Sequence, residues 1–376
     1  MILRENQPLA PFTTLGIGGP ARWFAEAESE DEIAEAADWA RQRRVPLFVL
    51  GGGSNLLVSD AGFDGLVLRI TLRGVEAEHG APGPGRMEQP GSRIYRVAAG
   101  EDWDGFVNRA VADDCAGVEC LAGIPGTVGG TPVQNVGAYG QEVASVIESV
   151  RAFDLERREF VEMTAAECNF SYRRSRFNST DRGRFAVTRV DYRLTPGGAP
   201  VLRYPDVERA IEQRGADGGE PSLGEVAAVV RAIRLSKGML LVEGDPDCRS
   251  AGSFFKNPVV SEDLFQKIAA RGAAPHYPAG PGMVKIPAAW LIEQAGFRKG
   301  YRRGAAGISS KHTLALVNRG GATAEEILAL ANEICAAVEA RFGIRLEMEP
   351  VLVGTHSVFG ASDKRSTGEW NSTRRG

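Results

Sequence analysis

Residues 122–140 read AGIPGTVGGTPVQNVGAYG, and four glycines fall within eight residues of this stretch: Gly123, Gly126, Gly129 and Gly130. A second cluster, GGGSN at 51–55, follows the apolar run VPLFVL at 45–50. Glycine lets backbone N–H groups approach an anion closely, and serine and asparagine add side-chain hydrogen bonds. We interpret the two clusters as loops that clamp one diphosphate from two sides, with the short cluster TLGIGG at 14–19 adding to them. The alternative is a set of ordinary tight turns.

The familiar phosphate-loop signatures are absent from both clusters. A Rossmann fingerprint requires GxGxxG at the opening of a helix and an acidic residue about 20 positions further on, and a Walker A loop requires GK[ST]. Neither pattern occurs here. The sequence therefore predicts a dinucleotide site, and it does not require a nicotinamide cofactor in a Rossmann fold.

The composition is that of an ordinary globular protein of 376 residues, with 43% hydrophobic and 24% charged residues, and this length favours two or three domains. The net charge of −4 does not favour nucleic acid as the main partner. Five scattered cysteines with no CxxC pair, and four scattered histidines, argue against a disulfide framework or a metal site. No run of 18 apolar residues predicts a membrane span, and the first residues lack the apolar segment of a secretory signal.

The hydrophobic pattern predicts a mixture of strands and helices. Ser29 and Glu32 form a capping-box pattern before the first helix. Residues 80–93, 215–221 and the polar tail 354–376 are expected to lack regular structure. A new unit is expected to begin near residue 245. The expected strands are 21–25, 45–50, 65–70, 95–100, 147–154, 185–194 and 314–317, and the other expected helices are 103–112, 205–213, 222–236, 290–295 and 324–342.

Residues 8–353 contain, in order, the motifs TLGIGGPA, VLGGGSNLLVSD, AGIPGTVGGTPVQNVGAYG, YRRSRF at 172–177, AGSFFKNP at 251–258 and LEME at 346–349. Together these motifs resemble those of the UDP-N-acetylenolpyruvoylglucosamine reductases (MurB). The resemblance implies an α+β fold: an FAD-binding domain of the vanillyl-alcohol-oxidase-like (PCMH-type) fold and a smaller α+β substrate-binding domain. It implies FAD-binding lobes at 1–74 and 75–244 (FAD domain about 18–195), a substrate domain at 245–353 and the tail at 354–376.

The activity implied by the resemblance is the reduction of UDP-N-acetylglucosamine enolpyruvate to UDP-N-acetylmuramate. NADPH supplies the hydride through bound FAD, in the synthesis of peptidoglycan precursors in the bacterial cytoplasm. The implied partners are these two small molecules, without nucleic acid or membrane, and we expect a monomer. FAD is implied to bind at Gly51, Gly52, Gly53, Ser54, Asn55, Gly123, Ile124, Pro125, Gly126, Thr127, Gly129 and Gly130.

Three residues match the catalytic positions of the family. Reduction places negative charge at C2 and on the adjacent carboxylate, so catalysis needs a cation there and a proton donor to C2. By resemblance, Arg173 meets the carboxylate, Ser253 donates the proton, and Glu349 stabilises the enolate as the protonated acid. Taken without the resemblance, they are a surface arginine, a turn serine and a solvent-facing acid with Glu347 as its competitor.

Substrate contacts are implied at Tyr204, Lys237, Asn257, Tyr277 and Lys285, with Tyr204 corresponding to the loop tyrosine of the type I subgroup. Each of them could instead be an ordinary strand-end, helix-end or loop residue. The chain departs from the family pattern in two places, at 238–244 and at 249–250, on the approach to Ser253. His312 falls where relatives often carry glutamine.

Two other functions remain open from the residues. A flavin oxidase of the same wider fold would accept oxygen and often attach FAD through a histidine, but His79 is the only histidine before residue 245 and lies outside both glycine clusters. A nucleotide-binding protein without catalysis has no need for Arg173, Ser253 and Glu349 together.

Overall fold

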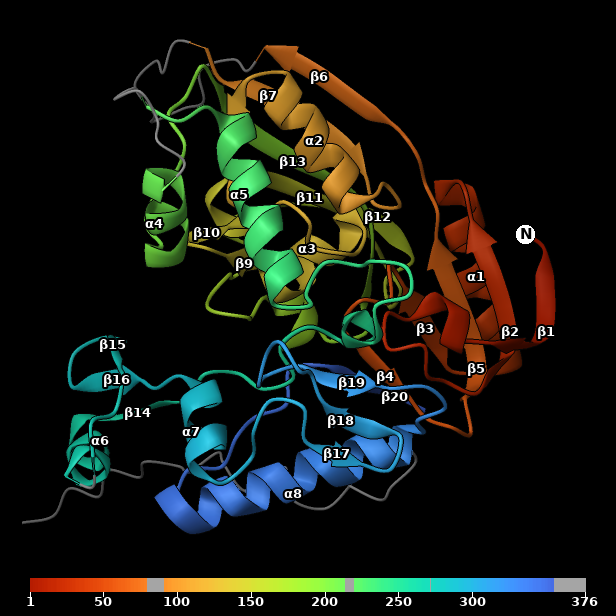
Figure 1. Cartoon of the computed structure of the whole chain (residues 1–376). Coiled ribbons are helices and arrows are strands. Elements are labelled where there is room, and N and C mark those ends of the chain that lie inside the picture. The colour runs from red at the N-terminus through yellow and green to blue at the C-terminus, as the bar shows by residue number, and fades with distance from the viewer. Residues whose placement is uncertain (80–90, 214–219, 271, 355–376) are drawn as a thin grey trace, which may run out of the picture.

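The computed structural model describes residues 1–79, 91–213, 220–270 and 272–354. Three groups of elements follow one another along the chain (Figure 1). Residues 80–90 and 215–219, within two of the expected loops, and residues 355–376 of the expected tail lie outside the described residues.

The first group is a mixed four-stranded sheet in the order β1-β2-β5-β3, in which β1 is antiparallel to β2 and the other neighbours are parallel. Helix α1 begins after Ser29, whose side chain accepts a hydrogen bond from the backbone N–H of Glu32. The expected capping box is only half formed, because the Glu32 carboxylate accepts from the backbone N–H of Glu28 instead of Ser29. The elements are β1 (Leu3–Pro8), η1 (Ala10–Phe12), β2 (Pro20–Ala27), α1 (Glu30–Arg43), β3 (Leu47–Leu50), β4 (Leu56–Val58) and β5 (Phe63–Ile70).

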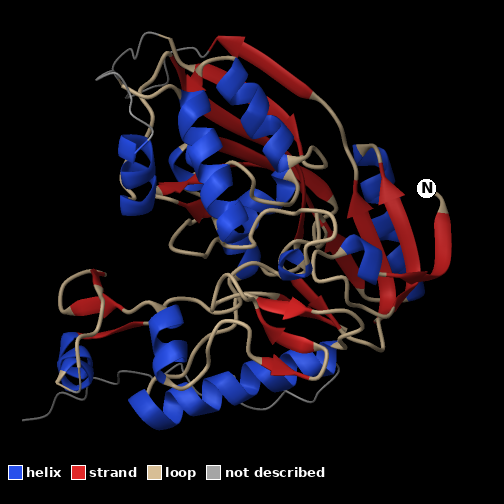
Figure 2. Ribbon diagram, viewed as in Figure 1, coloured by secondary structure: helices blue, strands red, loops and turns tan. Residues whose placement is uncertain are grey.

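The second group is an antiparallel sheet in the order β12-β11-β13-β7-β6, and β8 pairs with the end of β13. Helices α2 and α5 contact each other and lie on one face of this sheet (Figure 2). The strands of the second group are β6 (Val75–His79), β7 (Arg93–Ala98), β8 (Cys115–Ala116), β9 (Gly137–Ala138), β10 (Gln141–Glu142), β11 (Ile147–Asp154), β12 (Glu159–Thr164) and β13 (Phe185–Pro196). Of these, β9 and β10 form a separate two-stranded sheet. Its helices are α2 (Trp103–Ala112), η2 (Glu119–Leu121), η3 (Val128–Gly130), α3 (Thr131–Gln134), η4 (Val143–Ser145), η5 (Arg176–Asn178), α4 (Pro205–Gln213) and α5 (Leu223–Ser236).

The third group has two small antiparallel sheets, β14-β16-β15 and β17-β18-β19, with the long helix α8 packed against β18 and β19. Its elements are η6 (Pro246–Cys248), β14 (Val259–Ser261), α6 (Glu262–Ala269), β15 (Tyr277–Pro278), β16 (Met283–Lys285), α7 (Ala288–Gln294), β17 (Arg302–Arg303), β18 (Ala306–Ile308), β19 (Leu316–Asn318), α8 (Ala324–Phe342) and β20 (Val351–Val353).

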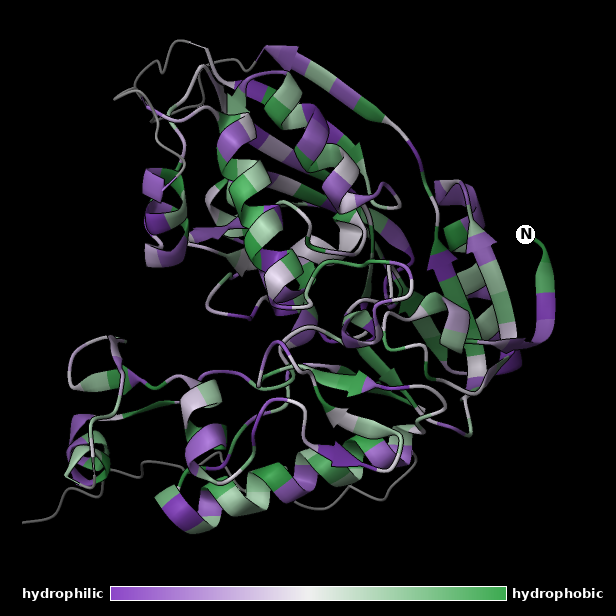
Figure 3. Ribbon diagram, in the orientation of Figure 1, coloured by the Kyte–Doolittle hydropathy of each residue, from purple (hydrophilic) through white to green (hydrophobic). Residues whose placement is uncertain are grey.

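Strand β20 returns to the first group, where it pairs in parallel with β4 directly after the GGGSN loop. The core of the third group is continued in the same way by Leu15, Ile17 and Leu57 of the first group. The first two groups share another core, in which Ile33 of α1 belongs to one cluster with Tyr95 of β7. The apolar residues of α5 and α8 appear as green segments on these helices in Figure 3. Apolar burial of this kind stabilises the positions of the three groups against one another.

Most of the expected elements are confirmed, with bounds that agree for α2, α4, α8 and β11. The expected strand 21–25 is longer in the structure, and strand 314–317 begins later. The elements that were not predicted are strands β1, β4, β6, β8–β10, β12, β14–β18 and β20 and helices α3 and α6. Within the described ranges, no helix combines the length and the apolar character needed to cross a bilayer.

Candidate active site

The two glycine clusters meet each other backbone to backbone. A Cβ atom placed on Gly52 would lie 2.5 Å from Cα of Gly126 and 2.8 Å from the backbone nitrogen of Thr127. A Cβ on Gly126, whose φ is +133°, would lie 2.9 Å from the Ser54 hydroxyl oxygen. Only residues without side chains allow this approach. The predicted convergence of two loops separated in sequence is therefore confirmed.

A cavity of about 390 Å³ lies against both loops. All of the predicted cofactor residues line it except Gly123, whose N–H donates to Asp104 and whose carbonyl accepts from Arg234. The Thr127 hydroxyl in the wall is buried and has no hydrogen-bond partner in the described part of the chain. A buried polar atom of this kind is costly unless a ligand satisfies it. Glycine loops beside an unpartnered hydroxyl fit the diphosphate of a dinucleotide.

The third glycine cluster does not line this cavity. The hydroxyl of Thr14 bonds the carbonyl oxygens of Ser54, at 3.2 Å, and Ser250, at 2.6 Å. Leu15 and Ile17 are buried in the core of the third group. The cluster therefore fastens the GGGSN loop to the segment that leads to Ser253.

Ser253 and Glu349 are brought together by two chain segments that pair. The N–H of Glu349 donates to the carbonyl of Phe254 at 2.9 Å, and the N–H of Lys256 donates to the carbonyl of Glu347. The amide of Asn55 donates to the carbonyl of Glu349 at 3.2 Å, so this pair adjoins the GGGSN loop. The hydroxyl of Ser253 makes no side-chain hydrogen bond to any residue that the structure describes, which leaves it available to a ligand.

Glu349 and its competitor Glu347 lie in different surroundings. The Glu349 side chain is 14% exposed, whereas that of Glu347 is 71% exposed and pairs with Lys256. Burial raises the pKa of Glu349, and the nearby charges of Arg173 and Lys256 only partly oppose this. The geometry favours Glu349 as the residue that carries a proton.

Arg173 reaches the same place from the second group. Its Nη2 donates to the carbonyl of Gly137 at 2.7 Å. Its Nε lies 3.2 Å from Oε1 of Glu349 but has no hydrogen-bond partner among the described residues, so the contact with Glu349 is electrostatic. A cation thus lies against an acid of raised pKa, and Ser253 directly precedes Phe254, whose carbonyl accepts from the N–H of this acid.

Tyr204 and Lys237 lie together at the ends of α4 and α5. The ring of Tyr204 meets that of Tyr139 edge to face at 5.3 Å, and Nζ of Lys237 lies 5.9 Å from the Tyr139 ring centroid. Nζ of Lys237 also lies 3.1 Å from a carboxylate oxygen of Asp206. Burial raises the pKa of Tyr204, and Asp206 and Tyr277 add to this effect. The result is a cation flanked by two tyrosines.

Tyr277 and Lys285 face each other in the register of β15 and β16. Nζ of Lys285 lies 4.8 Å from the ring centroid of Tyr172, the residue before Arg173. Asn257 accepts a hydrogen bond from the N–H of Ala288 at the start of α7. Tyr277 is 56% exposed. Lys285 of the third group therefore contacts the second group next to Arg173.

Three residues of this region were missed by the sequence reasoning: Tyr139, Asp206 and Arg234. Arg234 is buried and bonds the carbonyls of Gly123 and Met239, which ties the end of α5 to the second glycine loop. Tyr139 belongs to a quoted motif, but only its packing against Tyr204 indicates a role. Burial, together with the nearby charges of Lys237 and Lys299, lowers the pKa of His312 to about 4, so its imidazole is neutral near pH 7.

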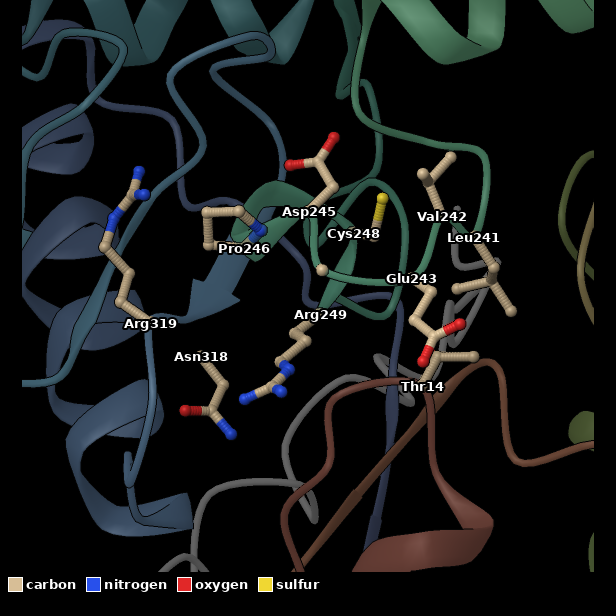
Figure 4. Close-up of a pocket in the computed structure, with 11 residues that line it drawn as sticks. Thr14, Leu241, Val242, Glu243, Asp245, Pro246, Cys248, Arg249, Asn318 and Arg319 are labelled. Carbon is tan, nitrogen blue, oxygen red and sulfur yellow. The ribbon is translucent and has the colours of Figure 1, made fainter.

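A second cavity of about 450 Å³ lies between the 241–249 segment, Thr14 and β19. Figure 4 shows the side chains of Arg249 and Asn318 extending toward one another in this cavity. None of the predicted site residues lines it. Glu243 and Asp245 lie in the same wall as Arg249 and Arg319, so the wall does not select one sign of charge.

Comparison with known families assigns the two halves of the chain. A family model described as FAD binding domain matches residues 21–162, and the model of the UDP-N-acetylenolpyruvoylglucosamine reductase C-terminal domain matches residues 245–353. The first match covers both glycine loops, and the second covers Ser253 and Glu349. The protein is thus an FAD-dependent oxidoreductase in which a separate C-terminal domain adjoins the flavin site.

Similar proteins of known name agree with this division. A UDP-N-acetylenolpyruvoylglucosamine reductase of Thermobifida fusca is 45% identical over 93% of this chain and 98% of that protein. The reductase of Streptomyces coelicolor is 46% identical over 93% and 90%. The crystal structure of the MurB reductase from Thermus caldophilus covers 94% of this chain and 100% of its own, with a TM-score of 0.61 and 28% identity. The chain belongs to the UDP-N-acetylenolpyruvoylglucosamine reductase family.

Proposed function

We propose that this protein reduces UDP-N-acetylglucosamine enolpyruvate to UDP-N-acetylmuramate, with NADPH as the source of the hydride. The observation that carries the proposal is the contact of Arg173 with the buried Glu349, whose backbone bonds Phe254, the residue after Ser253, and Asn55 of the glycine-lined cavity. The three residues come from distant parts of the chain, and we propose that their cation, hydroxyl and buried acid act on one substrate group. The reaction requires these three groups around the enolpyruvyl carboxylate.

FAD, when bound, supplies the hydride that reaches the vinyl C3 of the substrate. We assign its diphosphate to the loops at 51–55 and 124–130, where glycine backbone and the Thr127 hydroxyl are available. We further propose that lobes 1–74 and 75–244 hold the cofactor between them, and that residues 245–353 close over the substrate. The shared core of the first two groups and the return of β20 to β4 support this division.

In the proposed mechanism, Arg173 holds the substrate carboxylate through its guanidinium group. Glu349, as the protonated acid, donates a hydrogen bond to the charge that develops on that carboxylate. Ser253 transfers its proton to C2, because the negative charge that develops at C2 makes this carbon basic enough to accept it, and solvent then returns a proton to the serine. We place the substrate diphosphate against Lys237 and Tyr204, and the rest of the nucleotide along Asn257, Tyr277 and Lys285.

We also propose that the protein acts as a monomer in the bacterial cytoplasm. An oxidase that attaches FAD through a histidine is disfavoured, because His79 lies on β6, is exposed and does not line the cavity. A protein that only binds nucleotides is disfavoured by the buried acid and the free serine beside the cavity.

Anaerobic flavin absorbance tests the proposal directly. NADPH should bleach the yellow protein, and the enolpyruvyl nucleotide should restore the colour without oxygen. Mass spectrometry should then detect the lactyl product, which has two more hydrogens than the substrate. Recovery of colour with oxygen alone would favour the oxidase, and failure of NADPH to bleach the flavin would favour a binding protein.

Replacement of Tyr204 by phenylalanine is expected to weaken binding of the enolpyruvyl nucleotide by about 1 kcal/mol, or roughly fivefold, because one hydrogen bond to the diphosphate is lost. The rate at saturation should change less. Titration by calorimetry measures the affinity. Tyr301→Phe is the matched control, because its hydroxyl donates to Glu333 in the third group. An unchanged affinity in Tyr204→Phe would remove this residue from the diphosphate site.

Replacement of Glu349 by glutamine is expected to change the pH dependence of the step with the enolpyruvyl nucleotide. Burial raises the pKa of Glu349, so the wild-type acid keeps its proton above the usual range, and the rate should fall as the pH rises through that raised value. Glutamine keeps an N–H donor that does not titrate, so this fall should disappear from the profile measured by stopped flow. Glu347→Gln should retain the wild-type pH profile. If the fall in rate with rising pH disappears in Glu347→Gln instead, Glu347 is the acid.

A further inference from the structure

The backbone of Arg173 lies in a conformation that side-chain-bearing residues seldom adopt. Its φ is +54°, at the tip of the turn Ser171–Arg174, which two backbone hydrogen bonds between Ser171 and Arg174 close. The amide of Asn178 donates to the carbonyl of Arg173 at 3.2 Å. A left-handed residue of this kind persists only where its surroundings enforce it, so the turn must be held from outside.

Asn135 supplies the second hold on this turn. Its amide nitrogen donates to the carbonyl of Ser171 at 3.0 Å and to a carboxylate oxygen of Glu142 at 2.9 Å. Its amide oxygen accepts from the N–H of Ala144 at 3.1 Å. The residue is 1% exposed. Each donor and acceptor of the Asn135 side chain is therefore used, which is what a buried amide requires.

The contacts of Asn135 enclose Arg173 from two sides. Ser171 is the base of the turn that carries Arg173. Glu142 of β10 pairs with Gly137 of β9. The carbonyl oxygen of Gly137 accepts a hydrogen bond from Nη2 of Arg173 at 2.7 Å. One side chain thus fixes both the backbone of Arg173 and the carbonyl on which its guanidinium rests.

The position of Asn135 links this arrangement to the cofactor cavity. Its chain neighbours Gln134 and Val136 both line that cavity. Asn135 itself has a φ of +47° and closes helix α3. Asparagine is common at such a helix end for its backbone alone, but glycine serves equally well there. The end of a helix does not require the three hydrogen bonds that the Asn135 side chain makes.

We propose that Asn135 is a positioning residue for Arg173, which it holds in the geometry that receives the substrate carboxylate. The inference rests on the proposed function, because it takes Arg173 as the group that meets that carboxylate. Asn135 makes no contact with substrate in this scheme. Its effect passes through the turn and through the Gly137 carbonyl.

Asn135→Gly removes the amide and keeps the left-handed backbone, so it isolates the side chain. The variant should retain full FAD content and the wild-type rate of bleaching by NADPH. Single-turnover recovery of colour with the enolpyruvyl nucleotide should slow by about tenfold, the effect of roughly one misplaced hydrogen-bonded group. Asn169→Gly is the matched control, because Asn169 has a φ of +50° and is exposed. The control should behave as wild type.

A double-mutant cycle distinguishes positioning of Arg173 from a general structural role. In an Arg173→Ala background, Asn135→Gly should cause no further slowing. Equal slowing in both backgrounds, equal slowing of both halves of the reaction, or no slowing at all would overturn the inference. If Asn135→Gly does not fold, Glu142→Ala enters the same cycle and must give the same pattern. Failure of the wild-type protein to recover its colour with the enolpyruvyl nucleotide would overturn the proposed function itself.

Discussion

Ser253→Ala should slow recovery of the flavin colour by the enolpyruvyl nucleotide about 10²–10⁴-fold, which is the usual contribution of a well-placed general acid. This corresponds to about 3–5 kcal/mol of barrier. Bleaching by NADPH needs no proton donor, so that half of the reaction should keep its wild-type rate. The structural basis is that Ser253 directly precedes Phe254, which bonds Glu349, while its own hydroxyl is not engaged by any described residue.

Stopped-flow absorbance of the flavin measures the two halves separately. Ser253→Cys should recover part of the loss, because a thiol can also deliver a proton. Ser92→Ala is the matched control, since the Ser92 hydroxyl accepts from Arg193 at the large sheet and lies outside the site. Equal slowing of both halves in Ser253→Ala would mean that Ser253 only shapes the flavin pocket. Full activity of Ser253→Ala would mean that Ser253 is an ordinary turn serine without a role in catalysis.

The fold was predictable where the apolar pattern is long and its ends are marked. Helix α8 begins at a full capping box, in which Thr323 and Glu326 bond each other's backbone N–H, and it ends at Gly343 with a φ of +68°. Those signals lie in the sequence itself. The three-residue strands β4 and β20 carry no comparable signal, and their pairing joins residues almost 300 positions apart. Such pairings are decided by tertiary packing.

The candidate site divides in the same way. The glycine loops were predictable because the absence of a side chain is itself the functional feature, as the contact between Gly52 and Gly126 illustrates. Asn135 could not be assigned a role, because its partner Ser171 is 36 residues away. Glu349 was preferred to Glu347 only by resemblance, and burial supplies the independent physical reason. The identity and spacing of residues in the sequence indicate which chemical groups a site contains, whereas the burial of a side chain in the structure indicates whether it holds its proton.

Gly52→Val should abolish FAD binding, so the purified protein should be colourless. A Cβ at this position would lie 2.5 Å from Cα and 2.8 Å from the carbonyl carbon of Gly126, and both are backbone atoms that no rotamer change can move away. The two loops must separate, and the cradle for the diphosphate opens with them. The ratio of flavin to protein absorbance in the purified sample measures FAD content, and far-UV circular dichroism with thermal unfolding reports the fold.

The loss should be specific to the contact between the loops and not to valine as such. Gly224→Val is the matched control, because a Cβ there meets nothing closer than 3.9 Å and the residue is exposed in α5. That variant should keep its colour, since valine is a slightly better helix former than glycine and its side chain meets no close neighbour there. Gly126→Val should lose FAD as Gly52→Val does, because it forces a side chain into a φ of +133° and against the Ser54 hydroxyl. If either loop variant folds and purifies with its full complement of FAD, the diphosphate does not bind at that loop, and the cavity must hold another part of the cofactor.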